Sequence, residues 1–161
     1  NGSMTPFVGT HQGRLDGKGR ISIPSQFRAL LKAGSTDPSA PSTPLMMNPS
    51  NGEACIEVRS ETAFNDFTAG IYELDHLSER RNDLELTYFA LSVHLKIDDE
   101  GRVVIPPKLR EEVGLTEKSD IAFVGRGNYF QIWDASHADT RVDLARRRTK
   151  ERGDTLPGRT R

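Results

Sequence analysis

Two arginines stand at positions where they could contact nucleic acid. Arg20 and Arg102 each follow a glycine directly and an aspartate by four positions. A guanidinium can bond a guanine edge bidentately or hold phosphate oxygens, and an arginine held next to a turn loses little entropy on binding. The alternative is that each arginine pairs with its own aspartate, Asp16 or Asp98, and pins the turn. The two roles are compatible.

The segments that contain these arginines are copies of one another. Residues 16–28 and 98–110 align without a gap at an offset of 82 residues, with six of thirteen positions identical. This self-similarity indicates an internal duplication. The identical pairs are Asp16/Asp98, Gly19/Gly101, Arg20/Arg102, Ile23/Ile105, Pro24/Pro106 and Arg28/Arg110.

Each copy is predicted to form a tight turn, a short strand and a helix. Asp side chains bond downstream amides and glycine tolerates a positive φ, so residues 16–19 and 98–101 are typical of turns. Residues 21–23 and 103–105 contain mostly β-branched side chains, which favour strands. A unit of this size cannot bury its own apolar face, so it needs a partner.

Prolines and glycines mark the ends of the expected helices. Pro24 and the pair Pro106–Pro107 suit a first helical turn, where proline loses no intrahelical bond. Gly34 and Gly114 suit the positions just past the helix ends. Two later segments, 45–58 and 121–134, are typical of β-hairpins. Further helices are expected at 61–74, 77–93 and 136–150, and the Ser/Pro/Thr-rich loop 33–44 is assigned no structure.

The duplicated motif resembles the MraZ family of the AbrB-like swapped-hairpin superfamily, over a stretch from Phe7 to about Leu144. The matching residues are Leu15, Asp16, Lys18–Arg20, Ile23, Pro24, Phe27 and Arg28, then Asp98, Gly101–Val103, Ile105, Pro106, Leu109, Arg110, Gly114 and Leu115, and Val124, Gly125, Asn128, Phe130 and Ile132–Asp134. The resemblance implies an α+β fold. In it, two tandem swapped-hairpin β-loop-helix units form a pseudo-symmetric β-barrel flanked by helices.

The resemblance divides the chain into four parts. The first repeat is expected at 4–75, a connecting helix at 76–93, the second repeat at 94–140, and a basic helix end and tail at 141–161. Asn1–Ser3 precede Met4 and are expected to be the remainder of an expression tag.

Charge is distributed unevenly along the chain. Residues 141–161 carry a net charge of +5 and the other 140 residues −6. The two copies differ as well: residues 11–32 carry +4 and residues 94–118 carry −1. Because counterion release favours a basic surface, the first copy is expected to dominate DNA contact. Arg28 and Arg110 are expected to face outward from their short helices. Salt bridges or ring contacts explain them as well as phosphate binding does, and the structural role is preferred.

The resemblance implies a sequence-specific transcriptional regulator of the division and cell-wall gene cluster. It would be cytoplasmic and nucleoid-associated, and it would bind promoter direct repeats as a multivalent ring. Double-stranded DNA and further copies of the chain are the expected partners. The candidate DNA-binding residues are Arg14, Lys18, Arg20, Lys96 and Arg102. Two alternatives stay open: an AbrB-like antitoxin that binds a toxin through its tail, and a purely structural ring.

No other chemistry is predicted from the residues. The four histidines have no metal-ligand spacing, and the single cysteine, Cys55, is interpreted as a half-buried strand residue. No serine lies in a nucleophile elbow, so neither an enzyme nor a cofactor is expected. The apolar runs are too short for a membrane span.

Overall fold

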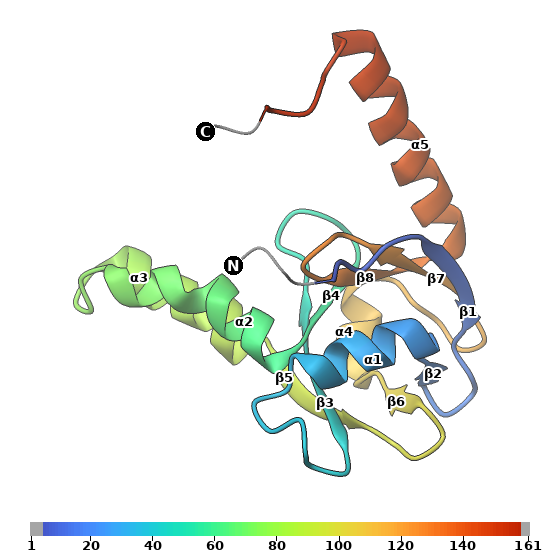
Figure 1. Ribbon diagram of the computed structural model, residues 1–161, viewed down its shortest axis with the longest axis horizontal. Coiled ribbons are helices and arrows are strands. Elements are labelled where there is room, and N and C mark those ends of the chain that lie inside the picture. Colours follow the sequence, from blue (N-terminus) through green and yellow to red (C-terminus); the bar gives the residue numbers. More distant parts are fainter. Residues whose placement is uncertain (1–4, 159–161) are drawn as a thin grey trace.

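The computed structural model describes residues 5–158 (Figure 1). Asn1–Ser3, the expected tag remainder, lie outside these residues, as do Arg159 and Arg161 of the basic tail. The first half contains β1 (Thr10–Arg14), β2 (Arg20–Ser22), α1 (Ser25–Ala33), β3 (Thr43–Pro49) and β4 (Ile56–Arg59). The second contains β5 (Val93–Ile97), β6 (Arg102–Val104), α4 (Pro107–Glu112), β7 (Asp120–Gly125), β8 (Phe130–Asp134) and α5 (Ala135–Arg152).

The strands form two antiparallel sheets that show the duplication directly. The large sheet has the order β1-β7-β8-β4-β3-β5, and β2 pairs with β6 in a separate two-stranded sheet. Strands β1, β3 and β4 of the first half correspond to β5, β7 and β8 of the second. The order is symmetric, because each strand lies as far from one edge of the sheet as its counterpart lies from the other edge. The halves therefore pair mainly with each other, as expected for units too small to be stable alone.

The chain is an α+β protein, as predicted, but the prediction of a closed barrel is wrong. β1 and β5 lie at the two edges of the large sheet and do not pair with each other. The β2–β6 ladder is only three residues long and stays separate. Pro24 and Pro106 lie just beyond the ends of these strands, and a proline has no backbone N–H with which to extend a ladder.

Both halves contribute side chains to one apolar core between the sheets and the short helices. Phe27 of α1 packs edge-on against Phe7, with ring centroids 5.1 Å apart, and lies 4.8 Å from Phe130 of β8. The two short strands follow one rule: the central residue of each, Ile21 or Val103, is buried, while the next residue faces solvent.

A helical arm lies between the two halves in the sequence. It consists of α2 (Glu61–Thr68), η1 (Ala69–Glu73), α3 (Glu79–Glu85) and η2 (Leu86–Ala90). The hydroxyls of Ser60 and Ser78 cap α2 and α3 by accepting the amides of Ala63 and Arg81. The arm extends to one side of the sheets, and α3 and η2 bury no residue (Figure 1). The expected helix 77–93 is shorter than predicted, because Val93 begins β5.

Helix α5 extends away from the sheets on another side (Figure 1). Asp134 caps its first turn by accepting the amide of His137, and Gly153, with a φ of 65°, ends it. Ala138 is the only residue of α5 that is fully buried. Within residues 5–158, no helix is both long and apolar enough to cross a membrane.

Two other predictions of local structure are corrected. The segment 33–44, to which the sequence assigns no structure, is anchored at both ends: Lys32 donates from Nζ to the carbonyls of Ala40 and Ser42, and the carboxylate of Glu61 accepts the amide of Thr36 at 2.8 Å. Cys55 is fully buried and precedes β4 instead of lying half-buried within a strand. Burial raises the pKa of the Cys55 thiol to about 12.

Candidate nucleic-acid interface

The turn between β1 and β2, residues 16–20, is built around the carboxylate of Asp16. Its Oδ1 accepts the amides of Lys18 and Arg20 at 2.9 and 2.8 Å, and its Oδ2 accepts Nε of Arg20 at 2.7 Å. The expected pairing of Arg20 with Asp16 is therefore confirmed. The two terminal nitrogens of Arg20 make no hydrogen bond within residues 5–158. These two nitrogens remain available to donate a pair of hydrogen bonds to a ligand with two acceptor atoms in one plane.

The hydrogen bonds to Asp16 stabilise its charged form. The backbone N–H of Arg20, followed by the Arg20 side chain, lowers the pKa of Asp16 to about 2 from an ordinary 3.8. The contribution of this carboxylate to stability is thus complete above pH 3.8 and is lost as the pH falls toward 2. Arg20 therefore stays anchored at any physiological pH.

The turn between β5 and β6, residues 98–102, has the same backbone but a different arrangement around its arginine. Asp98 Oδ1 accepts the amides of Glu100 and Arg102, each at 2.9 Å, and the Arg102 amide is the main cause of the lowered pKa of Asp98. Nε of Arg102 stands 3.4 Å from Asp98 Oδ2, without hydrogen-bond geometry. Its Nη2 instead donates to Glu100 Oε1 at 2.6 Å.

The two turns lie side by side at one end of the molecule (Figure 1). In the β2–β6 ladder Arg20 is opposite Val104, and Ser22 is opposite Arg102. Each turn is also bonded to the strand end of the other copy: the amide of Ile23 donates to the carbonyl of Gly101 at 3.0 Å, and that of Ile105 donates to the carbonyl of Gly19 at 2.9 Å. We call the surface formed by residues 16–22 and 98–104 the paired-turn surface.

Arg28 and Arg110 do not face outward as predicted. Their side chains pack against the backbone behind the paired-turn surface. Arg28 Nη1 donates to the carbonyl of Ile23 at 2.6 Å, and Arg110 Nε donates to that of Ile105 at 3.0 Å. Neither forms an ion pair within residues 5–158. Each guanidinium instead lies against the turn glycine of the other copy, so that a Cβ on Gly101 would come within 2.5 Å of Arg28 Nη1.

We therefore expect Gly101→Ala to lower the free energy of unfolding by about 1–2 kcal/mol, because its φ of 81° is unfavourable for alanine. The displaced Arg28 side chain adds to this loss. Urea unfolding of the variant measures the change. Gly127→Ala is the matched control, since its φ of 83° is equally unfavourable for alanine but a Cβ there meets nothing within 4 Å. Equal stability of the two variants would contradict the proposed contact.

The five residues that were predicted to contact DNA lie at or near the two turns. Arg14 ends β1, and Lys18 and Arg20 belong to the first turn; Lys96 lies near the end of β5, and Arg102 follows the second turn. Arg14, Lys18 and Lys96 are exposed and form no ion pair within residues 5–158.

Sequence reasoning overlooked two outward-facing residues between the arginines, Ser22 and Val104. Both are exposed, and Val104 keeps 48 % of its surface accessible. The signal was present, because each follows the buried central residue of its short strand and side chains alternate along a strand. An exposed hydroxyl and an apolar side chain offer further contacts to base edges.

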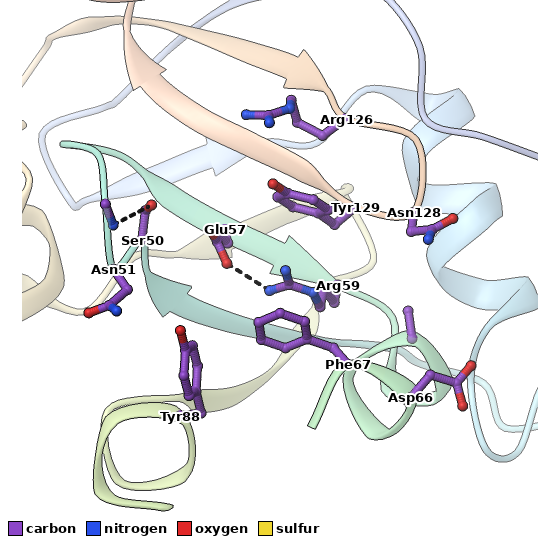
Figure 2. A pocket seen from close by; sticks show the side chains of 12 residues that line it. Ser50, Asn51, Glu57, Arg59, Asp66, Phe67, Tyr88, Arg126, Asn128 and Tyr129 are labelled. Carbon is purple, nitrogen blue, oxygen red and sulfur yellow. Dashed lines mark hydrogen bonds and ion pairs between the residues drawn. The ribbon is translucent and has the colours of Figure 1, made fainter. Parts of the chain in front are cut away.

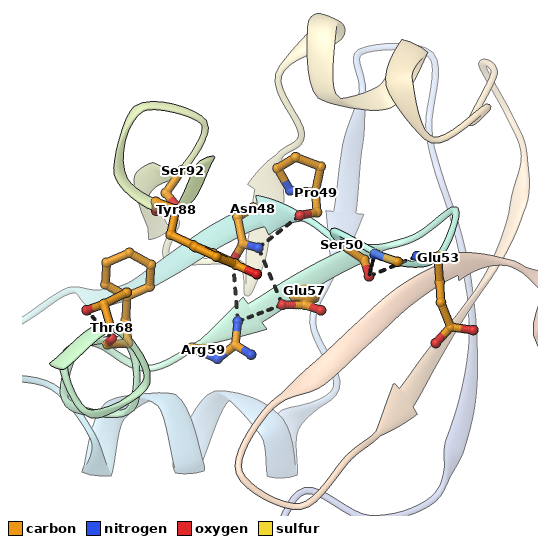
Figure 3. A network of polar contacts seen from close by, with 11 residues as sticks. Asn48, Pro49, Ser50, Glu53, Glu57, Arg59, Thr68, Tyr88 and Ser92 are labelled. Carbon is orange, nitrogen blue, oxygen red and sulfur yellow. Dashed lines mark hydrogen bonds and ion pairs between the residues drawn. The ribbon is translucent and has the colours of Figure 1, made fainter. Parts of the chain in front are cut away.

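A cavity of about 620 Å³ lies elsewhere, between the arm and the β7–β8 turn. Arg59 at its floor is 5 % exposed, and its guanidinium lies 3.6 Å from the ring centroid of Phe67 and 4.3 Å from that of Tyr129 (Figure 2). Its Nη1 donates to Glu57 at 2.9 Å and to Asn48 at 3.4 Å (Figure 3). Of these residues Phe67 belongs to α2, so its contact with Arg59 joins the arm to the sheet.

The residues described by the structure contain no cluster of His, Cys, Asp or Glu that could hold a metal ion. The fold and the paired-turn surface define a class of protein. It is an α+β chain made of two β-turn-helix units whose strands pair with each other, and each unit presents an arginine beside an aspartate-centred turn on a shared surface.

Comparison with known proteins identifies the family. A family model matches residues 7–85 and 89–138, and its description reads MraZ protein, antitoxin-like. The chain belongs to the MraZ family, which is not an enzyme family. Two relatives, each named transcriptional regulator MraZ, come from Gluconobacter oxydans and Gluconacetobacter diazotrophicus. They are 39 % identical over 91 % of this chain and 87 % of the relative, and 37 % identical over 92 % and 90 %, respectively.

Proposed function

We propose that the chain is a transcriptional regulator that binds double-stranded DNA through its paired-turn surface. The observation that carries this proposal is the arrangement of Arg20 on its turn. Arg20 is held by Asp16 through Nε, which leaves its terminal nitrogens free for a guanine edge or a phosphate. The names of the relatives support a role in transcription.

The finer proposals follow the family resemblance. The repeats at 4–75 and 94–140, joined through 76–93, act as one swapped-hairpin DNA-binding unit. Several copies assemble into a ring, which binds adjacent direct repeats upstream of the division and cell-wall gene cluster, in the cytoplasm at the nucleoid. Each further contact within a ring is intramolecular, so multivalency supplies much of the affinity.

The first turn is proposed to contribute more to binding than the second. Lys18 and Arg14 add positive charge around Arg20 and have no acidic partner within residues 5–158. Around the second turn, Glu100 is paired with Arg102, and Asp99 is also exposed. A phosphate approaching the first turn therefore meets the more favourable potential.

A gel-shift titration tests the proposal. The protein is titrated against DNA from upstream of its own gene, with a scrambled-repeat duplex of equal length and composition as the control. Preference for the intact repeats supports a sequence-specific regulator. Equal binding to both duplexes would remove that claim.

One observation favours a second candidate, an antitoxin that binds a toxic protein through its tail. Helix α5 projects from the sheets with its last turns exposed (Figure 1), and the family description makes the same comparison. Co-purification of a small toxic protein with the full chain, but not with a chain shortened after Ala145, would support it.

The basic end of α5 is expected to add non-specific affinity. Arg141, Val142 and Ala145 line a groove against the sheet, whereas residues 146–152 extend beyond it. Removing residues 146–161 should therefore leave the fold intact and flatten the plot of log K against log salt by about 0.9 for each phosphate that these residues neutralise in the full chain. A chain ending at Gly153 is the control. A folded, shortened protein with an unchanged slope contradicts the prediction.

A further inference from the structure

The two turns differ in charge at two pairs of equivalent positions. Gly17 corresponds to Asp99, which adds a negative charge to the second turn, whereas the other pair reverses the sign of the charge. Lys18 of the first turn aligns with Glu100 of the second at the same offset of 82 residues that relates the arginines. The backbone surroundings are the same, because the amide of each residue donates to the aspartate two positions earlier, Asp16 or Asp98, at 2.9 Å. The side chains, one cationic and one anionic, therefore occupy corresponding places on the paired-turn surface.

These side chains act differently on their arginines. Glu100 Oε1 accepts Nη2 of Arg102 at 2.6 Å, which occupies part of the fork that would otherwise face DNA. Lys18 makes no side-chain hydrogen bond or ion pair within residues 5–158, and it leaves both terminal nitrogens of Arg20 free. Although each arginine has an acidic partner, residues 16–20 carry a net charge of +1 and residues 98–102 a net charge of −2.

We propose that the Lys18–Glu100 difference determines which arginine engages DNA. Lys18 attracts a DNA phosphate to the first turn, whereas Glu100 keeps Arg102 of the second turn from binding DNA. The inference rests on the proposed function and deepens it. It also gives the nearly two-fold surface a polarity, so that each subunit binds a DNA site in one orientation only.

The ion pair between Glu100 and Arg102 is expected to oppose DNA binding but to contribute little to the stability of the fold. The Glu100 side chain is 72 % exposed, and exposed ion pairs contribute little to stability. A phosphate beside Arg102, however, must either displace Glu100 or lie close to its charge, which is unfavourable. Removing that charge therefore acts on binding and leaves the folded structure nearly unchanged.

Single substitutions give the first test, in anisotropy titrations on the upstream repeat duplex. Glu100→Gln should tighten binding by roughly 3- to 10-fold, since it removes a repulsive charge beside the phosphates. Lys18→Gln should weaken binding by a similar factor and reduce the salt slope by about one. Glu73→Gln is the matched control, because this exposed arm residue loses the same charge far from the turns.

The decisive variant exchanges the two residues, Lys18→Glu with Glu100→Lys, so that composition and net charge stay unchanged. In this background, Arg102→Ala should weaken binding more than Arg20→Ala, which inverts the order expected in the unexchanged protein. An exchanged protein in which Arg20 still dominates, or in which both arginines matter equally, overturns the inference. Wild-type protein that fails to prefer the repeats over scrambled DNA refutes the proposed function itself, a distinct result.

Discussion

Replacing Arg20 by alanine is expected to abolish preference for the upstream repeats. A bidentate arginine–guanine contact is worth about 1–3 kcal/mol of discrimination, roughly 5- to 150-fold per subunit. If several subunits bind adjacent repeats together, the losses multiply. Gel-shift titration with intact and scrambled repeats measures the loss directly.

The variant should remain folded, which makes the result interpretable. Asp16 Oδ1 still accepts the amides of residues 18 and 20 without the guanidinium, so the turn keeps its backbone bonds. Thermal unfolding checks this. Arg20→Lys is the matched variant: it retains the charge but not the planar fork. Preserved repeat preference in Arg20→Lys would show that Arg20 contacts phosphate only, and equal losses in Arg20→Ala and Arg102→Ala would contradict dominance of the first turn.

Local structure around the turns could be predicted because its causes are local. The Asp-to-Gly spacing specifies which amides a carboxylate can reach, and both turns form as expected at Asp16 and Asp98. Pro24 and Pro106 lie at the N-caps of α1 and α4, one position before the first turn predicted for them, whereas Pro107 opens α4 as predicted. The side-chain bond from Arg20 to Asp16 also follows from sequence spacing alone.

Features that depend on contact between the halves could not be predicted. Arg28 reaches the turn of the other copy, which no spacing within its own repeat reveals. Whether the sheet closes depends on β1 meeting β5, at opposite ends of the strand order. The pairing of Glu100 with Arg102 is a side-chain choice between two nearby carboxylates, and the sequence offers both.

Arg59 was overlooked for a related reason. It stands two positions after Glu57 in β4, on the same face of the strand, a spacing that is common in exposed strands. What makes the pair significant is burial beneath Phe67 of the arm and Tyr129 of the β7–β8 turn. That burial arises only after three distant segments have come together.

Arg59→Ala is therefore expected to cause the largest loss of stability among these variants. It leaves Glu57, with a side chain only 13 % exposed, without its cation, and breaking a buried pair typically costs about 3–5 kcal/mol. The stacking on Phe67 and Tyr129 is lost as well. Urea unfolding measures the change in the free energy of unfolding.

Two comparisons distinguish a buried pair from a general effect of removing arginine. Arg81→Ala breaks a more exposed pair with Glu85 and the hydrogen bond from Arg81 Nη1 to the carbonyl of Leu74, and it should cost only about 1–2 kcal/mol. In Arg59→Met with Glu57→Gln, no charge remains buried, so part of the stability should return. Because Arg59 fastens α2 to the sheet, limited proteolysis of Arg59→Ala should cut first within residues 61–92. A loss no larger than that of Arg81→Ala would mean that the arm is held by its apolar contacts and not by this pair.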